Sequence, residues 1–490
     1  MEGGVKIKSV SIANFRGIKR LEAPVELGAL GFFIGDNGTG KTSLLEAMNF
    51  CLSSGYVASR LDVNDFYNGG DEPIEIVVEF QSPLTAKLPD GFTSQDVACD
   101  KVILRAKKRD RAAPGKAFSD LVTTSHHLVP VEPRGEKGWS KLRKNGTTFH
   151  FDERLLLPGN VEVDLPRVFY FSKTRVRQLS KGFNSSLSSI IDDLNWRFDR
   201  GQRRKAEGDH FKHHRRALQD RIFAETDGDT LKKTIGAAND ILAKLGVPPV
   251  EVSLLKTLNP YDNAEVVFPF DGFELPAEHG GSGIEMLLSL ALLEAMAVLS
   301  KEKLIILVDE PELHLHPKLQ AKLVEHLAEL SDRVQIVAST HSPLLFKNAF
   351  RNPNAKLQIT KQYQGAVRVE DAHSAGFGYL QWSPSWGEIS YLAYDLPTVE
   401  FHDDLYCSLE DRFRSSPVKK TSQADFDQWL VDQGHPREIR WVDANGAQRE
   451  ETLMTYVRNR IHHPENRHRP EHSEEQLAES IKRMCQLIRP

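Results

Sequence analysis

The sequence contains little cysteine and no long apolar segment, and both shortages narrow the class of protein. Four cysteines among 490 residues show no paired metal-ligand spacing and are too few for a disulfide framework, which favours a reducing compartment. The longest apolar stretch, 286–299, is shorter than a membrane-spanning helix and contains Glu294. The polar start, 1–10, does not resemble a signal peptide. We therefore expect a cytoplasmic protein with no membrane partner.

An excess of charge of one sign is also absent. The 63 lysines and arginines nearly balance the 68 acidic residues, and the formal net charge is -5. The chain as a whole should therefore not be attracted to nucleic acid or to anionic lipid. The basic stretch 197–216 is a local exception, which is either a solvated helix face or a nucleic-acid contact.

The apolar patterns predict an α/β fold. Residues 5–12 and 73–80 alternate between apolar and polar side chains, as strands with one solvated face do. The continuous apolar runs 303–308 and 334–338 are typical of buried parallel strands, and a helical pattern over 317–330 lies between them. We expect a mixed sheet that combines both kinds of strand.

The length predicts two or three domains. Residues 1–375 hold nearly all the strand patterns and form the expected head, with a loop-rich insertion at about 83–165 and a helical arm at about 178–245. After that point the strand signal fades. Residues 376–490 are therefore expected to form a mainly helical C-terminal domain that acts as an effector or binds a partner.

A phosphate-binding loop lies between an apolar strand and a helical pattern. Gly35, four residues and then Gly40-Lys41-Thr42 fit the Walker A pattern in full. Glycines let backbone N–H groups turn toward phosphate oxygens, a lysine neutralises the phosphates, and Thr42 can ligate Mg²⁺. A glycine turn without a ligand is the alternative. The predicted nucleotide-binding residues here are Gly35, Asp36, Asn37, Gly38, Thr39, Gly40, Lys41, Thr42 and Ser43.

Two acidic residues follow the apolar run 303–308. The run 303–308 ends in Asp309 and Glu310, the Walker B pattern, which delivers the first acid to Mg²⁺ and the second to the attacking water. His341 follows the next apolar strand, 31 residues after Glu310, where it can reach the γ phosphate. We therefore expect ATP and Mg²⁺ to bind, with Thr42 and Asp309 at the metal and Glu310 and His341 catalytic.

These motifs together resemble the ABC-type ATPases of the RecF and OLD (overcoming lysogenization defect) group, within the wider AAA class. The matching segments are Asn14-Phe-Arg-Gly-Ile, Ile34-Gly-Asp-Asn-Gly-Thr-Gly-Lys-Thr-Ser-Leu-Leu-Glu, Val308-Asp-Glu-Pro-Glu-Leu-His-Leu-His-Pro and Ser339-Thr-His-Ser-Pro. The resemblance implies a head with a mixed sheet, an antiparallel lobe and a helical insertion. It also implies that two heads sandwich ATP, so the chain should form a dimer or a higher oligomer.

The same resemblance implies a signature segment that caps the γ phosphate from the second head. By the order of the family's motifs it should precede the helical stretch 284–299, which points to Gly281, Ser282 and Gly283. This segment departs from the family, because glycines replace the usual Leu-Ser pair and only Ser282 offers a hydroxyl.

Two metal-site interpretations of the tail are weaker than their alternatives. Asp425 and Asp427 have the spacing of a Toprim nuclease pair but follow a polar stretch, so we interpret them as the first turn of a helix capped by Ser422. A histidine-rich segment near the end of the chain fits no zinc spacing. Its members are His462, His463, His468 and His472.

The tail also resembles the Arg-x4-to-6-His motif of HEPN (higher eukaryotes and prokaryotes nucleotide-binding) ribonucleases. Arg458 and Asn459 are followed, after three residues, by His463, and the earlier helical segment 397–406 is expected to contribute a polar group. The resemblance implies metal-free RNA cleavage through attack by a 2'-OH. His462 shares a helix face with Arg458, so either histidine could be the active one. A basic helix end is the non-catalytic alternative.

A RecF/OLD-like head joined to a short effector tail resembles bacterial anti-phage defence ATPases, including PtuA subunits of Septu systems. This implies a phage-derived trigger and RNA or DNA as the target. Three hypotheses stay open: a sensor ATPase with its own ribonuclease tail, an ATPase scaffold that controls a separately encoded HNH nuclease, and a RecF-like DNA-repair ATPase.

Overall fold

The computed structural model of the chain divides into two compact units, 1–174 with 296–490, and 175–295. The second unit is described only as the hairpin β13 (Val267–Phe270) and β14 (Phe273–Pro276) and residue 291. The expected helical arm and the basic stretch 197–216 lie outside the described residues. The structure describes residues 5–52, 61–87, 96–108, 122–131, 139–142, 148–151, 155–157, 162–163, 165–172, 267–270, 273–276, 291, 304–313, 315–374, 376–415 and 422–489.

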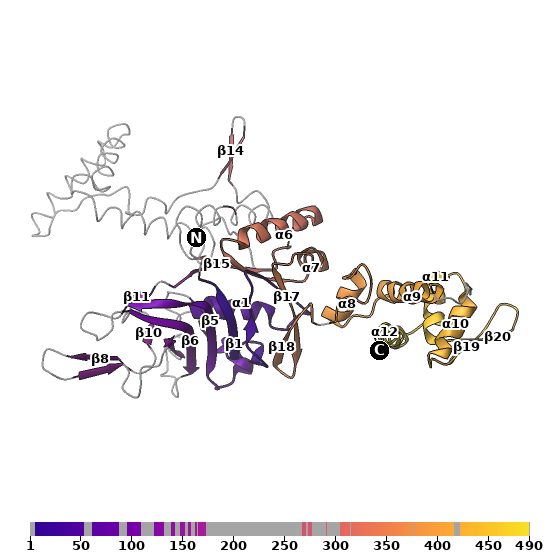
Figure 1. Cartoon of the computed structure of the whole chain (residues 1–490), viewed down its shortest axis with the longest axis horizontal. Coiled ribbons are helices and arrows are strands. Elements are labelled where there is room, and N and C mark those ends of the chain that lie inside the picture. Colours follow the sequence, from indigo (N-terminus) through magenta and orange to yellow (C-terminus); the bar gives the residue numbers. More distant parts are fainter. Residues whose placement is uncertain are drawn as a thin grey trace, which may run out of the picture. The chain divides into compact units, whose positions relative to one another are not determined.

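Parallel strands form one end of the large sheet in the first unit (Figure 1). Every residue of three of these strands is buried, as expected for strands covered on both faces. The two apolar runs predicted as parallel strands are therefore confirmed. In sheet order, all parallel, the strands are β17 (Ala355–Tyr363), β4 (Leu30–Ile34), β16 (Gln335–Thr340), β15 (Leu304–Asp309) and β12 (Arg167–Phe171).

An antiparallel lobe continues the same sheet, which has 14 strands among the described residues. The mixed α/β class expected from the sequence is confirmed. The lobe contains β1 (Ile7–Phe15), β2 (Ile18–Leu21), β3 (Val25–Glu26), β5 (Ile74–Lys87), β6 (Asp96–Lys108), β7 (Val122–Pro130), β10 (Leu155–Leu157), β11 (Glu162–Val163) and β18 (Ala366–Asp371). Two short 3-10 helices, Val63–Asp65 and Tyr67–Gly69, and the hairpin β8 (Trp139–Leu142) and β9 (Thr148–Phe151) complete it.

Strands β6 and β7 lie in a segment that the sequence suggested to be rich in loops. The pairing of β6 with β7 shifts register between Cys99 and Lys101. Before this bulge odd-numbered residues such as Val97 face the core, and after it even-numbered residues such as Val102 and Leu104 do. A bulge interrupts the period of two on which recognition of a strand depends.

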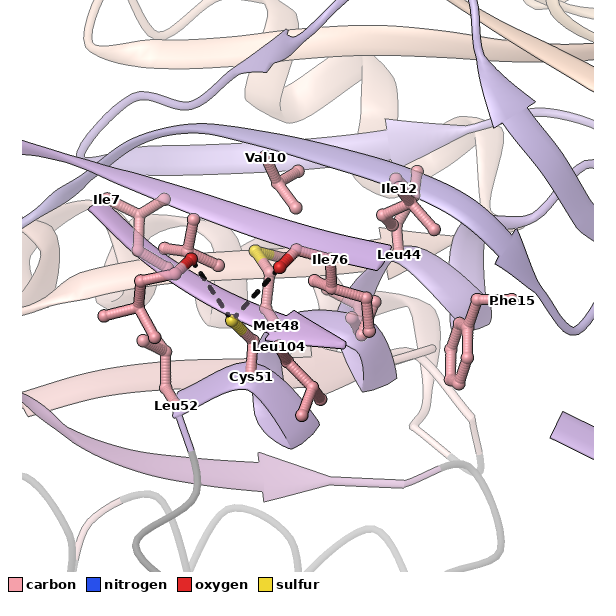
Figure 2. Packing of buried hydrophobic residues seen from close by; sticks show 14 of the residues in the cluster. Ile7, Val10, Ile12, Phe15, Leu44, Met48, Cys51, Leu52, Ile76 and Leu104 are labelled. Atoms are coloured by element: carbon pink, nitrogen blue, oxygen red, sulfur yellow. Dashed lines mark hydrogen bonds between the residues drawn. The ribbon is translucent and has the colours of Figure 1, made fainter. Parts of the chain in front are cut away.

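Helix α1 (Lys41–Leu52) packs against the antiparallel lobe and contributes to the hydrophobic core there. Leu44 and Met48 are fully buried, and Figure 2 shows them among apolar side chains of β1, β5 and β6. At the far end of the helix, the Cys51 thiol donates weak hydrogen bonds to the carbonyls of Ile76 (3.7 Å) and Val102 (3.6 Å). Burial raises the pKa of this thiol to about 12. The helix is thereby fixed against the sheet.

Helices α6 (Pro317–Ser331) and α7 (Pro343–Phe350) follow β15 and β16. The helix predicted over 317–330 is confirmed, with a proline at its first position where no backbone donor is needed. Ser342 caps α7 by accepting a hydrogen bond from the amide of Leu345.

The C-terminal region is mainly helical, as expected, and has a hydrophobic core of its own around Phe401, Tyr406 and Met454. We call its helices α9 to α12, with their hairpin, the C-terminal module. One hairpin was not predicted from the sequence. The elements after β18 are α8 (Trp386–Tyr394), α9 (Val399–Arg414), α10 (Gln423–Asp432), β19 (Ile439–Val442), β20 (Gln448–Glu451), α11 (Leu453–His462) and α12 (Glu474–Ile488).

Helix α10 begins where the sequence predicted. The Ser422 side chain accepts a hydrogen bond from the amide of Asp425, and the Asp425 carboxylate bonds back to Ser422. Asp427 is buried and pairs with Arg437 at 2.7 Å instead of facing a metal. Over the described residues, no group of three or more His, Cys, Asp and Glu could hold a metal ion, and no helix is long and apolar enough to cross a membrane.

Candidate functional site

The three motifs of the head meet at one edge of the sheet. Strands β4, β16 and β15 are parallel neighbours, so their carboxyl ends lie side by side. The phosphate loop follows β4, Asp309 ends β15, and His341 follows β16. The sequence order of the motifs is thus converted into a single site.

The loop before α1 has the geometry of an anion site. Lys41 is almost fully buried, and its Nζ donates hydrogen bonds to the carbonyls of Gly35 (2.8 Å) and Asp36 (2.7 Å). A Cβ on Gly35 would lie 2.3 Å from the carbonyl oxygen of Thr360, and Gly40 has a φ of 92°. Both positions therefore require glycine. The loop ends at the N-terminus of α1, where the helix dipole favours a negative ligand.

Hydroxyl groups from one strand and one helix converge on Asp309. The Thr42 hydroxyl lies 3.1 Å and 3.0 Å from its two carboxylate oxygens, and the Ser339 hydroxyl donates to the same carboxylate. Asp309 has no exposed surface. Carboxylate and hydroxyl oxygens are ligands that suit Mg²⁺, which takes few protein ligands and completes its shell with phosphates and water. The donor set therefore fits the magnesium site expected from the sequence.

Glu310 lies beside His341 in an unusual backbone conformation. Its φ is 51°, in the left-handed region that residues other than glycine seldom adopt, and its amide donates to the carbonyl of Ser339. The Glu310 carboxylate is 3.8 Å from Nε2 of His341. A carboxylate and an imidazole at this separation can act on one water molecule or one phosphate oxygen.

A further acid, Glu312, holds the loop after β16 and was missed by sequence reasoning. Its Oε1 accepts hydrogen bonds from the Thr340 hydroxyl (2.8 Å) and from the amides of His341 (2.7 Å) and Ser342 (3.1 Å). Burial raises the pKa of this carboxyl. The one feature of the sequence that could have indicated a role for Glu312 is its position two residues after Glu310.

The predicted signature residues Gly281, Ser282 and Gly283 lie outside the described residues. Of the head residues proposed from the sequence, the structure brings together those from the loop, Asp309, Glu310 and His341.

A second group of polar side chains lies between α9 and α11. Nε2 of His462 is 3.1 Å from Oδ2 of Asp403, and the Arg458 guanidinium lies 5.9 Å from the ring centre of Tyr406. Arg458 and His462 are one turn apart on α11, as Asp403 and Tyr406 are on α9. The segment expected to form an earlier helix with a polar group is α9, and Asp403 is that group.

His463 does not join this group. It is the residue after the last turn of α11, its side chain is half exposed, and its Nδ1 lies 3.3 Å from Glu465. Asn459 is buried, and its side-chain oxygen accepts hydrogen bonds from the Arg458 guanidinium (3.2 Å) and from Gln423. Its side-chain NH2 donates to Glu451 at 3.3 Å. The asparagine of the motif therefore contacts the arginine and joins it to the interior of the C-terminal module.

His402 borders the same group from inside α9. It is fully buried, its Nε2 lies 2.9 Å from the Ser480 hydroxyl, and burial lowers its pKa. Burial also lowers the pKa of His472. These two imidazoles are thereby kept neutral beside the more exposed His462.

Comparison with known proteins places the head in a family. A family model described as an AAA ATPase domain matches residues 5–127 and 147–346. The chain belongs to this AAA ATPase family. It is 24% identical to an OLD nuclease of Thermus scotoductus over 350 residues, which cover 69% of this chain and 59% of the nuclease. It is 34% identical to the Septu protein PtuA of Bacillus thuringiensis over 79 residues, covering 16% and 19%.

The resemblance to the OLD and PtuA proteins inferred from the motifs is thus confirmed for the ATPase head. The chain spans about three fifths of the length of the OLD nuclease. Among solved structures, the recombination mediator protein RecF is similar, with a TM-score of 0.35 and 13% identity over 75% of this chain and 98% of RecF.

Proposed function

We propose that this AAA ATPase is an ATP-hydrolysing switch of an anti-phage defence system, and that its C-terminal module cleaves RNA. The observation that carries the first part is the convergence of Thr42, Ser339 and Asp309 beside Glu310 and His341. Residues that lie far apart in sequence are arranged there as phosphoryl transfer requires.

In the head, each residue has a separate task. Lys41 and the amides of residues 35–43 bind the phosphates, and Thr42 with Asp309 would hold Mg²⁺, which would supply positive charge at the phosphates. Glu310 orients and deprotonates the attacking water, and His341 donates a hydrogen bond to the γ phosphate. Gly281, Ser282 and Gly283 of a second copy would close the site, so the switch works as a dimer or a higher oligomer.

In the C-terminal module, Asp403, Arg458 and His462 form the proposed ribonuclease site. The contact between Nε2 of His462 and Asp403 leaves Nδ1 to take the proton of an RNA 2'-OH. The 2' oxygen then attacks the adjacent phosphorus, the bond to the 5' oxygen breaks, and the departing oxygen takes a proton from solvent, which gives a cyclic phosphate and a free 5'-OH. Arg458 holds the non-bridging oxygens in its fork. No metal takes part in this scheme.

Incubation of the purified chain with total cellular RNA, with and without ATP, tests this proposal. We expect cleavage by the wild-type chain and none by the double variant Arg458→Ala, His462→Ala, while ATP hydrolysis continues in both. His463→Ala is the matched control, because that histidine is exposed and lies outside the group. Cleavage that survives in the double variant would refute the ribonuclease site.

The similarity to PtuA supports a second candidate, an ATPase scaffold that binds a separately encoded nuclease. Large apolar side chains around α8 are exposed, which suits a partner surface. They are Trp382 (49%), Trp386 (49%) and Leu396 (56%). Protein that lacks ribonuclease activity but co-purifies with a nuclease encoded beside it would favour this candidate over the first.

A further inference from the structure

The backbone N–H and C=O groups of His341 are each bound by a side chain. From the head, the Glu312 carboxylate accepts the hydrogen bond of its amide at 2.7 Å. From the other side, the Tyr394 hydroxyl donates a hydrogen bond to its carbonyl oxygen at 2.8 Å. These two residues therefore fix both backbone polar groups of the residue that we assign to the γ phosphate.

The Tyr394 hydroxyl is a constant donor. Burial raises the pKa of Tyr394 well above its ordinary value, and the charges of Glu312 and Asp36 raise it further. The phenol therefore stays protonated at neutral pH. Because the carbonyl oxygen of His341 can only accept, the direction of this hydrogen bond is fixed.

Tyr394 is the last residue of α8, and α8 contacts both α7 of the head and α9 of the C-terminal module. The Tyr391 ring lies 5.3 Å from the ring of Phe401 in α9. A Cβ on Gly387 would lie 2.6 Å from the backbone nitrogen of the same Phe401, so the two helices are in backbone contact. This close approach packs the two helices tightly, so that a displacement of α9 is transmitted to α8.

The segment before α8 is bound both to α8 and to the end of the module. The buried Glu388 carboxylate accepts hydrogen bonds from the amides of Gly378 (2.7 Å) and Tyr379 (3.0 Å). Arg489, next to the end of α12, donates to the carbonyls of Gly376 (2.7 Å) and Phe377 (2.8 Å). Both ends of the module are thereby joined to the helix that carries Tyr394.

We infer that Tyr394 is a positioning residue through which the C-terminal module sets the place of His341, so that ATP hydrolysis and the state of the module are coupled. The inference rests on the proposed ATPase function and goes beyond it, because it names the contact that transmits the change. The same contact also runs from the head to the module, because a nucleotide that engages His341 acts through the Tyr394 hydroxyl on α8 and α9.

Tyr394→Phe in the full chain tests the coupling, because it removes one hydroxyl and keeps the ring. The turnover number and KM for ATP are measured together with hydrogen exchange of α8 and α9, with and without a slowly hydrolysed ATP analogue. We expect the turnover number to fall at least about fivefold with KM within about twofold, because a displaced His341 would stabilise the transferring phosphate less in the transition state. We also expect the variant to lose the nucleotide-dependent change in exchange that the wild type shows.

Tyr363→Phe is the control, because Tyr363 is 74% exposed on β17 and contacts neither His341 nor the module. A purely structural role of Tyr394 would change the melting temperature but leave both readouts as in this control, and that result overturns the inference. A loss of turnover without loss of the exchange response would mean a local effect and also overturns it. A wild-type chain that hydrolyses no ATP would instead overturn the proposed function, and the inference with it.

Discussion

The Thr42 hydroxyl lies 3.0 Å and 3.1 Å from the two carboxylate oxygens of Asp309, although 267 residues separate them in the chain. The pairing joins the first residues of α1 to the end of β15. It places the proposed metal ligands side by side, which is the arrangement that phosphoryl transfer requires.

Two substitutions in the head should separate nucleotide binding from hydrolysis. Lys41→Ala removes the phosphate-binding ammonium, so we expect ATP affinity to fall by about tenfold or more, since one lost charged hydrogen bond costs roughly 1.5–3 kcal/mol. Glu310→Gln should keep affinity but slow hydrolysis by about 10²-fold or more, the usual contribution of a general base. Equilibrium binding of a fluorescent ATP and phosphate release measure the two effects. A normal rate of ATP turnover in the Glu310→Gln variant would exclude Glu310 as the general base.

The contact between Asp403 and His462 makes a specific prediction about RNA cleavage. Asp403→Asn should reduce the cleavage rate by about 10²-fold, because a neutral amide no longer stabilises the protonated imidazole. ATP hydrolysis should be unaffected. Asp411→Asn, an exposed position on the same helix, is the matched control. An unchanged rate of RNA cleavage in Asp403→Asn would remove this residue from the proposed site.

Asp427 should matter for stability and not for chemistry. It is buried, pairs with Arg437 and accepts the amide of Thr452 at 3.1 Å, which joins α10 to the start of α11. Asp427→Ala leaves a buried donor and a guanidinium unpaired, and should cost about 3 kcal/mol of unfolding free energy. Urea unfolding followed by tryptophan fluorescence measures this. The exposed Asp432→Asn should change it by less than about 0.5 kcal/mol.

The stability of the C-terminal module should fall in mild acid. Burial lowers the pKa of His402 and His472 from the ordinary value of 6.5, so the unfolded chain takes up protons there that the folded module does not. The contribution of these histidines to the free energy of unfolding is complete above pH 6.5, the ordinary pKa. It is lost as the pH falls from there toward the lower pKa of the folded state, at about 1.4 kcal/mol per unit of pKa difference. The urea midpoint should therefore be lower at pH 5.5 than at pH 7.5.

His402→Gln should weaken this pH dependence, and His463→Gln, which alters an exposed imidazole, should preserve it. A midpoint that falls equally with pH in the wild type and in His402→Gln would show that other groups cause the loss.

The local features of the head and of several helix ends could be predicted from the sequence, because neighbouring residues create them. Glycine at 35 and 40 permits the loop, and apolar runs of five or six residues predict buried strands. Ser422 and Asp425 form a capping box within four consecutive residues. Pro464 restricts the residue before it, and α11 ends at His462 as that restriction suggests.

Other features depended on how elements pack, and no local period records that. The spacing alone places His462 on the same face of α11 as Arg458, but the pairing of His462 with Asp403 depends on how α11 packs against α9. The bulge in β6 interrupts the alternation of apolar and polar residues by which a strand is recognised. No feature of the sequence indicates a role for Tyr394.

The sequence by itself determined that a strand, a phosphate loop and a helix follow one another, since these are set by propensity and by backbone conformations that single residues impose. Only the tertiary structure decided which side chains meet: Thr42 with Asp309, Glu312 and Tyr394 with the peptide of His341, and Asp403 with His462. Such pairings arise when distant elements bury their apolar faces together, so their geometry is a property of the packed core and not of any segment.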